Sequence, residues 1–406
     1  MRSALAVVSL VSAVVGGIAV IVVGAALGLL GQSTTKTVVV AARPAPVADV
    51  PVVLRSSAKP LPRGAFDAAQ VYAGRSAGVV TIYSFFGTAT SATAAQGSGF
   101  VVSRDGTILT DAHVVTNAGE NGPGSGVSPA RAIFVEFNDH DRIPARVVGW
   151  DVFDDVGVIR VEPKAHTLAP VPLGHSSRVR VGEPVAAIGS PLGNENSLAV
   201  GVVSAVKRSI ASLTSRYQLI DAIQTDAPIT HGNSGGPLFD GRGRVIGINA
   251  QIRSQSGGGN DAGIGFAVPI DSAKRSMEDL LRTGGVRYAY IGATTEDLTP
   301  SLARHLKLSV DYGAMVDSVI PGAPAAAAGL LGGTDTEQFE GTEIVRGGDV
   351  IVAIDGIAVR NANDLVRIVS EQLRPGQIAT FSIVRAGTRR TIAVRLGQRP
   401  SNPHNP

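Results

Sequence analysis

The sequence predicts a β-rich main domain followed by a smaller second domain. The chain has 406 residues, which allows about two folded domains at roughly 100–200 residues each. Its 49 glycines and 23 prolines indicate frequent turns. Between residues 78 and 270, short β-branched segments alternate with turns, and no helical pattern of about 10–15 residues separates them. This pattern suits two packed barrels or a sandwich and disfavours a doubly wound α/β sheet.

The first element is a long apolar segment. Residues 4–32 carry no charge and are almost all Ala, Val, Leu, Ile or Gly. A helix over residues 4–31 would be about 42 Å long, enough to cross a hydrocarbon core of about 30 Å. A secretory signal peptide has an apolar run of only about 7–15 residues, so we expect a retained anchor. Small residues near Gly24 leave cleavage open. With two residues before the span, the short end is expected in the cytoplasm and the rest outside.

The composition shifts along the chain predict five consecutive parts. They are a cytoplasmic stub with a transmembrane anchor, a Pro/Ala-rich linker, a β-rich domain, a second domain and a disordered tail, at residues 1–31, 32–64, 65–284, 285–399 and 400–406. Within the β-rich domain, Val156–Val161 is one of the expected strands. One helix is expected at Asp271–Arg282, with Asp271 as its N-cap and Gly284 closing its end.

The composition also argues against several classes of function. The net charge of +3 is dispersed and aromatic residues make up 4%, so nothing indicates binding to nucleic acid. The absence of cysteine excludes disulfides, thiol catalysis, iron–sulfur clusters and cysteine-based zinc sites. The sequence has neither an H-E-x-x-H pair nor a G-x-x-x-x-G-K-[ST] loop, so we expect no metal and no cofactor.

The clearest chemical signal is GNSGGP at residues 232–237. Flanking glycines let a tight turn expose the Ser234 hydroxyl and aim neighbouring N–H groups at one point. A nucleophilic serine needs a base and an orienting acid, and both candidates lie upstream. His113 stands at the expected end of a strand in LTDAHVV, and Asp155 directly precedes the strand at Val156. The order is therefore His, Asp, Ser.

The same residues also match G-x-S-x-G, the nucleophile elbow of α/β hydrolases. That fold has the order Ser, then Asp or Glu, then His, and places a helix directly after the serine. The histidines after Ser234 are His305 and His404, and residues 237–243 are typical of a short strand and a turn. The pattern therefore does not favour an esterase of this type.

Six segments, in order, resemble the HtrA/Deg serine proteases. They are TDAHVV, DDVGVIRV, AIGSPLG, QTDAPITHGNSGGPL, VIGINAQ and GIGFAVPI. The resemblance covers about residues 65–399 and implies an all-β, chymotrypsin-like double β-barrel followed by one α+β PDZ domain. The family pattern implies Ser234 as nucleophile, His113 as general base and then acid, and Asp155 as the carboxylate that orients the imidazole. It implies an oxyanion hole formed by the N–H groups of Gly232 and Ser234.

Four features either depart from the family pattern or require a choice between neighbouring residues. Asp155 is preferred to the nearby Asp151 and Asp154 because the family's aspartate directly precedes the strand. Thr230-His231 replaces the usual Asn-Pro, and His231 is either a group that titrates near neutrality or a partly exposed loop residue. Gly-rich residues 117–130 shape the rim of the cleft or do nothing. Acidic residues 332–346 are expected as an inserted loop, either gating the peptide groove or serving as solvated decoration.

The segment Tyr290-Ile291-Gly292-Ala293 resembles the carboxylate-binding loop of the family's PDZ domains. Successive backbone N–H groups in such a loop bind a peptide's terminal carboxylate, and the peptide adds to the neighbouring strand. An amphipathic helix is expected at residues 363–372 because its apolar residues have helical spacing.

The resemblance implies a membrane-anchored, ATP-independent serine endopeptidase of the bacterial cell membrane, with its catalytic domain on the extracytoplasmic side. Its partners would be unfolded or regulatory protein substrates in quality control or stress response, peptide C-termini at the PDZ domain, and two further copies in a homotrimer. The alternative is a proteolytically inactive, membrane-tethered PDZ chaperone or scaffold. The complete set of His113, Asp155 and Ser234 favours the enzyme.

Overall fold

The computed structural model describes residues 66–88, 91–118, 126–190, 196–230, 232–250 and 264–400. The chain divides into two compact units, Met1–Pro60 and Leu61–Pro406, and all described residues belong to the second. The predicted anchor at residues 1–31, the linker at residues 32–64 and all of the predicted tail except Pro400 lie outside them. Among the described residues, no helix is long and apolar enough to cross a membrane.

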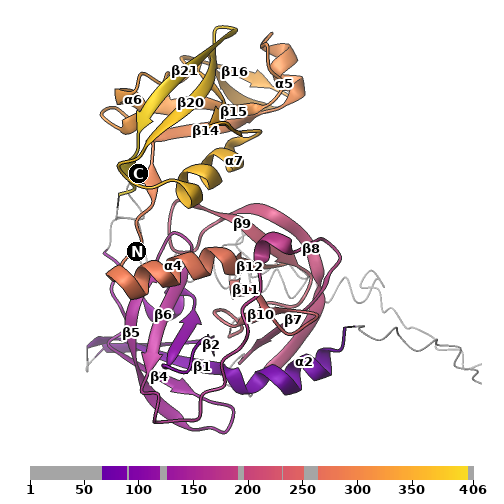
Figure 1. Cartoon of the computed structure of the whole chain (residues 1–406), viewed down its shortest axis with the longest axis vertical. Helices are drawn as coiled ribbons and strands as arrows, with labels where there is room; N and C mark the ends of the chain where they lie inside the picture. The colour runs from indigo at the N-terminus through magenta and orange to yellow at the C-terminus, as the bar shows by residue number, and fades with distance from the viewer. Residues whose placement is uncertain are drawn as a thin grey trace, which may run out of the picture. The chain divides into compact units, whose positions relative to one another are not determined.

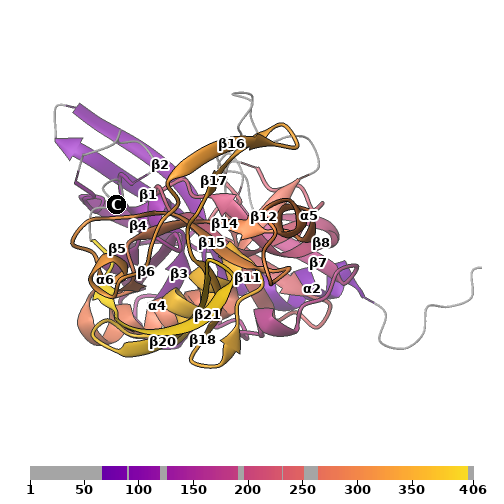
Figure 2. The same cartoon turned by 90° about the horizontal axis from the view of Figure 1, so that it is seen from above.

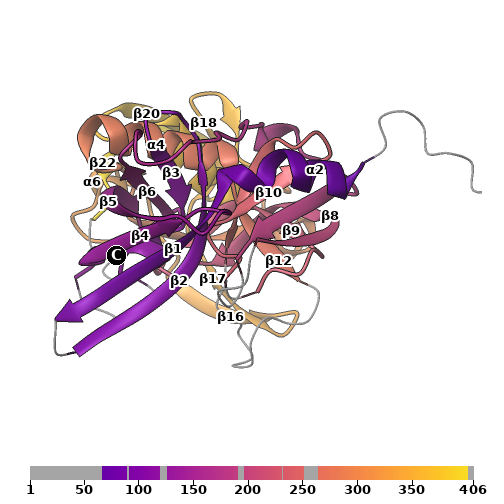
Figure 3. The ribbon, with the colours of Figure 1, turned by 90° about the horizontal axis from the view of Figure 1, so that it is seen from below.

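Two closed barrels confirm the predicted β-rich domain (Figure 1). The first barrel has the order β1-β2-β3-β6-β5-β4, with β1 (Val79–Thr88), β2 (Ser91–Val101), β3 (Thr107–Thr110), β4 (Ala132–Glu136), β5 (Arg142–Asp151) and β6 (Val156–Val161). The second has the order β10-β11-β12-β9-β8-β7, with β7 (Pro184–Gly189), β8 (Ser197–Ala211), β9 (Gln218–Thr225), β10 (Pro237–Asp240), β11 (Val245–Ala250) and β12 (Gly265–Pro269). Figure 3 shows the long antiparallel β1–β2 hairpin extending beyond the other strands of its barrel.

One buried cluster joins the two barrels. It includes Phe100 and Leu109 from the first barrel, Phe239 and Ile248 from the second, and Leu280 from helix α4, all at most 1% exposed. Burying such large apolar side chains is the main stabilising contribution of a fold of this kind. The two barrels are therefore held together by a shared core.

Four short helical segments accompany the barrels: α2 (Ala68–Arg75), α3 (Ala112–Val115), and 3₁₀ turns at Ser76–Gly78 and Ser176–Arg178. The longer helix α4 (Ile270–Thr283) closes the region.

Helix α4 corrects one detail of the sequence prediction. Its N-cap is Pro269, with no side-chain cap, because strand β12 runs directly into the helix. Asp271 lies in the first turn instead, where its carboxylate accepts a hydrogen bond from the Ser177 N–H. The C-terminal prediction is confirmed: Gly284 has a φ of 74°, and its N–H donates to the carbonyl of Leu280.

The second folded part is a sheet with short helices, as expected for an α+β domain (Figure 2). The main sheet has the order β14-β15-β18-β20-β21, with β19 also paired to β18. Its strands are β14 (Ala293–Leu298), β15 (Gly313–Val319), β18 (Val350–Ile354), β19 (Ile357–Ala358), β20 (Ile378–Arg385) and β21 (Thr388–Arg395), and β13 (Ala289–Tyr290) pairs separately with β22 (Gly397–Gln398). The helices are α5 (Pro300–His305), α6 (Pro324–Ala327) and α7 (Ala362–Arg367), which continues as a π-helical turn at Ile368–Gln372.

The expected helix at residues 363–372 is therefore present, with a change of helix type at Ile368. The expectation of a loop at residues 332–346 was wrong. This segment contains a hairpin of β16 (Asp335–Phe339) and β17 (Thr342–Arg346). The connection Glu340-Gly341 has φ values of 50° and 83°, as a two-residue type I′ turn requires, and Gly341 suits the second position. Gly341 was the available signal for a hairpin turn, but the acidic side chains of this segment suggested a solvated loop.

A buried carboxylate lies where the first barrel meets the chain that leads to the second part. Asp151, at the end of β5, is 3% exposed. Its Oδ2 accepts hydrogen bonds from the hydroxyls of Ser276 and Tyr288, and its Oδ1 accepts from the Phe153 N–H. Burial raises the pKa of Asp151, and these hydrogen bonds oppose that rise. The network holds the loop from β5 to β6 in place.

Replacing Tyr288 with phenylalanine should lower the free energy of unfolding by about 1–3 kcal/mol, because it removes a donor from a buried carboxylate. The lost bond raises the folded-state pKa of Asp151 further. The stability deficit is therefore present where the carboxylate is ionised and disappears as pH falls and it becomes protonated. Urea unfolding at pH 8 and pH 5 measures both effects.

The control is Tyr312→Phe, which changes a tyrosine that is 57% exposed. We expect no measurable change in unfolding for this variant. If both substitutions have equal effects, or if the Tyr288 effect is independent of pH, the proposed contribution of the Asp151 network is wrong.

Candidate active site

His113 and Asp155 come together because of how β3 and β6 pair. These strands are antiparallel neighbours, with Thr110 at the end of β3 opposite Gly157 near the start of β6. The residues just beyond them therefore meet at the same end of the barrel. His113 lies in the short helix α3 that directly follows β3, rather than at the end of a strand as predicted from the sequence.

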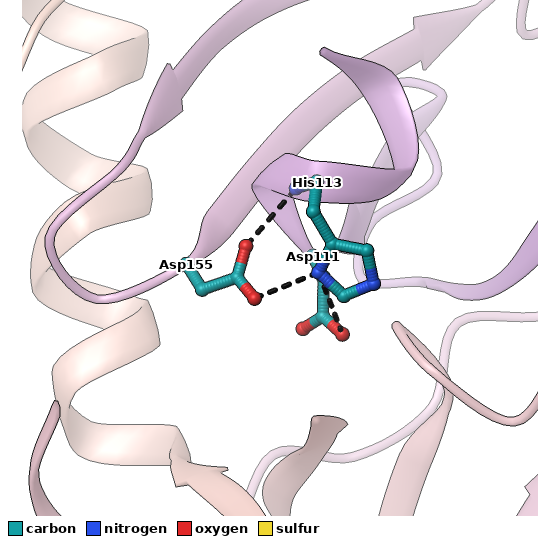
Figure 4. Close-up of side chains that lie close together, drawn as sticks. All are labelled: Asp111, His113 and Asp155. Atoms are coloured by element: carbon teal, nitrogen blue, oxygen red, sulfur yellow. Dashed lines mark hydrogen bonds and ion pairs between the residues drawn. The ribbon is translucent and has the colours of Figure 1, made fainter. Parts of the chain in front are cut away.

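The Asp155 carboxylate makes two hydrogen bonds to His113 (Figure 4). Its Oδ2 lies 2.8 Å from the imidazole Nδ1, and its Oδ1 accepts from the His113 backbone N–H at 3.0 Å. Because a carboxylate accepts, this contact assigns a ring proton to Nδ1 and leaves Nε2 as the nitrogen that can gain or lose a proton. Asp155 has a φ of 52°, a left-handed conformation that aspartate tolerates better than most residues.

The neighbouring Asp154 does not take this position. Its carboxyl is near Asp151 and Arg275, and burial, reinforced by the charge of Asp151, raises the pKa of Asp154 to about 7. Of the two adjacent acids considered from the sequence, the structure brings Asp155 to the imidazole.

The glycines around Ser234 are required by close backbone contacts. Gly232 has a φ of 100°, and its carbonyl accepts a hydrogen bond from the Ser98 hydroxyl. Gly235 has a φ of 81°, and a Cβ there would lie 2.3 Å from the Thr110 hydroxyl oxygen. The turn is also tied to strand β2, because the Ser98 N–H donates to the Ser234 carbonyl at 2.8 Å. The serine turn is thus packed against the end of the strand that leads into α3.

The Ser234 side chain is buried near this junction, with the residue 4% exposed. Its Oγ has no hydrogen-bond partner among the described residues, so no hydrogen bond joins it to His113 in this structure. Catalytic hydrogen bonds are often long in unliganded enzymes and shorten when substrate binds. His231, the departure from the family pattern, lies outside the described residues.

Asp111 is a third side chain at the imidazole that sequence reasoning did not single out. Its Oδ2 lies 3.9 Å from His113 Nδ1. Its position two residues before the histidine in LTDAHVV was the available signal. Burial lowers the pKa of His113, but the charge and hydrogen bond of Asp155 and the charge of Asp111 outweigh it and raise this pKa to about 9.

The described residues contain one group of three His, Asp or Glu side chains whose ligand atoms lie within 4.8 Å of one another: Asp111, His113 and Asp155. The hydrogen bond from Nδ1 to Asp155 already uses the imidazole nitrogen that faces both carboxylates. The arrangement therefore suits proton transfer at Nε2, and it needs no metal ion to explain it.

The segment proposed to bind peptide carboxylates forms a tight loop before β14. The carbonyl oxygens of Ile291 and Gly292 accept hydrogen bonds from the N–H groups of Ala325 and Ile320. Gly292 has a φ of 72°, and a Cβ there would lie 2.2 Å from the Cβ of Ala323. The backbone is therefore fixed in a conformation that only glycine adopts without strain.

A cavity of about 370 Å³ opens beside this loop. Tyr290 and Ala293 line it from the loop side, and Asn363 and Val366 line it from α7. Tyr217, just before β9 of the second barrel, lines the same cavity. A ligand in this cavity would contact side chains of both folded parts.

Comparison with known proteins identifies both parts. Residues 97–248 match the trypsin-like peptidase domain, and residues 289–396 match the PDZ domain. A DegP-like periplasmic serine endoprotease of Hahella chejuensis is 39% identical over 306 residues, covering 75% of this chain and 58% of the relative. The serine protease HhoA of Synechocystis is 35% identical over 313 residues, covering 75% of this chain and 71% of the relative.

Among solved structures, the HtrA-type protease AlgW with a tripeptide has a TM-score of 0.66 and 32% identity, covering 82% of this chain and 98% of that one. The fold and the matched segments define a trypsin-like peptidase domain joined to a PDZ domain. The chain belongs to the HtrA/Deg family of PDZ-containing serine proteases. It spans 56–58% of the length of the DegP-like relatives from Hahella chejuensis and Pseudomonas fulva.

Proposed function

We propose that this protein is a serine endopeptidase in which Ser234 is the nucleophile, His113 the general base and Asp155 the residue that orients it. The observation that carries the proposal is the 2.8 Å contact between Asp155 and Nδ1 of His113, beside a glycine-flanked serine turn. Hydrolysis of an unfolded protein by the wild-type chain, compared with Ser234→Ala, tests it.

The proposed reaction depends on which atoms of the three residues donate and accept protons. His113 Nε2 removes the Ser234 proton as Oγ attacks the substrate carbonyl, and it later gives that proton to the leaving amine. Asp155 holds the proton on Nδ1 and stabilises the imidazolium that forms. We assign the oxyanion hole to the N–H groups of Gly232 and Ser234, each contributing about 2.7–4 kcal/mol. Water then hydrolyses the acyl-enzyme by the same proton route.

We further propose that residues 4–31 anchor the protein in the bacterial cell membrane as a single span. The length and uniform apolarity of this segment support the anchor. The DegP-like relatives are described as periplasmic, which supports placing the protease domain (residues 65–284) and the PDZ domain (residues 285–399) on the extracytoplasmic side. Its substrates would be unfolded or regulatory proteins, and its assembly a homotrimer, as the family resemblance implies.

The second candidate function is a proteolytically inactive, membrane-tethered PDZ chaperone or scaffold. The unpartnered Ser234 hydroxyl is the specific observation in its favour, because an inactive site would also lack the serine–histidine hydrogen bond. The contact between Asp155 and His113 favours the enzyme. Measured hydrolysis distinguishes the two.

The PDZ domain is proposed to bind peptide C-termini at Tyr290, Ile291, Gly292 and Ala293 and thereby to change protease activity. The fixed backbone of this loop and the adjoining cavity support the binding site. The presence of Tyr217 in the same cavity supports the coupling to the second barrel. A ligand shifts an equilibrium only through its different affinities for the two states, typically giving a change of about 5–150-fold.

A peptide with an apolar C-terminal residue should therefore bind and change the rate of substrate cleavage in a saturable manner. Amidating its terminal carboxylate should weaken binding by about 10–100-fold, because a charged hydrogen-bond acceptor is lost. Gly292→Glu should abolish binding, since the new side chain occupies the loop and repels the carboxylate. Calorimetry and cleavage rates measured with the same peptides check both effects.

The amidated peptide is the matched control, because it tests recognition without altering the protein. Equal binding of the acid and the amide would contradict carboxylate recognition at this loop. Circular dichroism of Gly292→Glu shows whether its loss of binding is local.

A further inference from the structure

Asp111 brings a second carboxyl group to the His113 imidazole, beside that of Asp155. It is the residue just before helix α3 and is 0% exposed. Figure 4 shows the carboxylates of Asp111 and Asp155 both directed toward Nδ1 of the ring. Their ligand oxygens lie within 4.8 Å of each other. The catalytic base is thus flanked by two buried carboxyl groups.

The two carboxyl groups differ in their hydrogen-bond partners. Both oxygens of Asp155 accept hydrogen bonds from His113. Neither oxygen of Asp111 has a hydrogen-bond partner among the described residues. A buried carboxylate without a partner is strongly destabilised unless an opposite charge lies close by. A protonated imidazole 3.9 Å away supplies such a charge.

The other groups packed around this pair do not supply that charge. Asp155, from the turn before β6, adds negative charge and disfavours a second carboxylate. The serine turn contributes the Gly235 N–H, which lowers the pKa of Asp111 but carries no full charge and is bonded to the Asn249 carbonyl on β11. The charge of Asp111 therefore depends on the protonation of His113.

We propose that Asp111 is a positioning residue whose carboxylate stabilises the His113 imidazolium and so sets the lowest pH at which this imidazole acts as a base. The proposal rests on the proposed function of His113. Burial and the charge of Asp155 raise the pKa of Asp111 well above its ordinary value, and the charge of a protonated His113 opposes that rise. While His113 is protonated, Asp111 supplies the opposing carboxylate, and the ring cannot accept the Ser234 proton. As pH rises, one proton leaves Nε2 to solvent. The neutral ring, still bonded to Asp155 through Nδ1, becomes competent.

The direction of the pKa shift agrees with this geometry. The charge of Asp111 is one of the causes that raise the pKa of His113, after the contributions of Asp155. A single charge at 4–6 Å typically shifts a pKa by about 1–3 units. Removing the charge of Asp111 while keeping its shape should therefore lower the pKa of His113 by about 1–3 units.

The test uses Asp111→Asn, which has nearly the same shape and no charge. NMR of ¹⁵N-histidine-labelled full-length protein, in a Ser234→Ala background that prevents autolysis, follows the titration of His113. A His113→Gln variant assigns its signal. We expect the midpoint to fall by about 1–3 pH units in Asp111→Asn. In the control Asp154→Asn, which changes an acid on the side of Asp151 and Arg275, it should stay within about 0.3 unit.

A second measurement needs no substitution at Asp111. The ¹³C signal of the Asp111 carboxyl should show that this group is ionised before His113 loses its proton. A third measurement uses the pH dependence of activity, with Ser234 intact. The acidic limb of the kcat/KM profile of Asp111→Asn should move to lower pH by the same amount as the NMR midpoint.

The proposal is overturned if the His113 midpoint is unchanged or rises in Asp111→Asn, or if the Asp111 carboxyl titrates above His113. Because the NMR measurements do not depend on hydrolysis, they distinguish this proposal from the proposed function. A shifted midpoint in a protein that cleaves nothing would support the role of Asp111 and contradict the protease.

Discussion

Replacing Ser234 with alanine is expected to reduce the turnover of an unfolded protein substrate by about 10⁴–10⁶, the largest effect of any substitution considered. Members of a catalytic triad act as a unit, so loss of the nucleophile removes nearly all of the rate enhancement that the triad supplies. Replacing His113 with alanine should cost a similar factor. Initial rates of casein cleavage measure the loss.

The same substitution should leave the fold intact. The Ser234 hydroxyl makes no hydrogen bond within the described residues, so alanine removes no stabilising interaction there. The matched control is Ser84→Ala, because Ser84 in β1 is also a buried serine whose hydroxyl has no hydrogen-bond partner in the described parts of the chain. We expect the control to retain activity within about twofold and both variants to unfold like the wild type. Cleavage by Ser234→Ala above a hundredth of the wild-type rate would contradict the assignment.

Replacing Asp155 with asparagine is expected to lower kcat by about 10⁴. Asparagine keeps the shape but presents an N–H₂ group to Nδ1, which favours the imidazole tautomer with the proton on Nε2. That tautomer cannot accept the Ser234 proton. In the structure, one Asp155 oxygen lies 2.8 Å from Nδ1 and the other accepts from the backbone N–H of His113. A change of tautomer is therefore the effect we expect from Asp155→Asn.

The adjacent acid provides the control. Asp154→Asn alters a carboxyl of the same type one residue away, on the side of Asp151 and Arg275 rather than His113. It should cost less than about tenfold in kcat. If Asp154→Asn were the more damaging change, Asp155 would not be the orienting residue.

Much of this fold could be predicted because local signals agreed with the long-range structure. The β-branched run Val156–Val161 became strand β6 with the same bounds, and Gly284 ended helix α4 as expected. The sequence order of His113, Asp155 and Ser234, together with the six family segments, indicated a common site. Two of these residues were found in contact, and the third lies in a turn packed beside them.

What could not be predicted depends on contacts between distant segments. The cap of α4 is Pro269 because β12 enters the helix directly, which a local N-cap pattern at Asp271 does not reveal. The proximity of Asp111 to the imidazole depends on the conformation of the turn from β3 into α3, in which Asp111 is the N-cap. No spacing rule distinguishes a buried aspartate from a solvated one two residues before a histidine.

The most direct test of the central claim is to label the protein with a fluorophosphonate and locate the adduct by peptide mass spectrometry. Such reagents react with an activated serine, so the label reports the nucleophile and its base together. We predict one adduct, on Ser234, with loss of proteolysis in proportion to labelling, and no adduct in Ser234→Ala or His113→Ala. An adduct on another residue, or full proteolysis by the labelled protein, would contradict the assignment of Ser234 as the nucleophile.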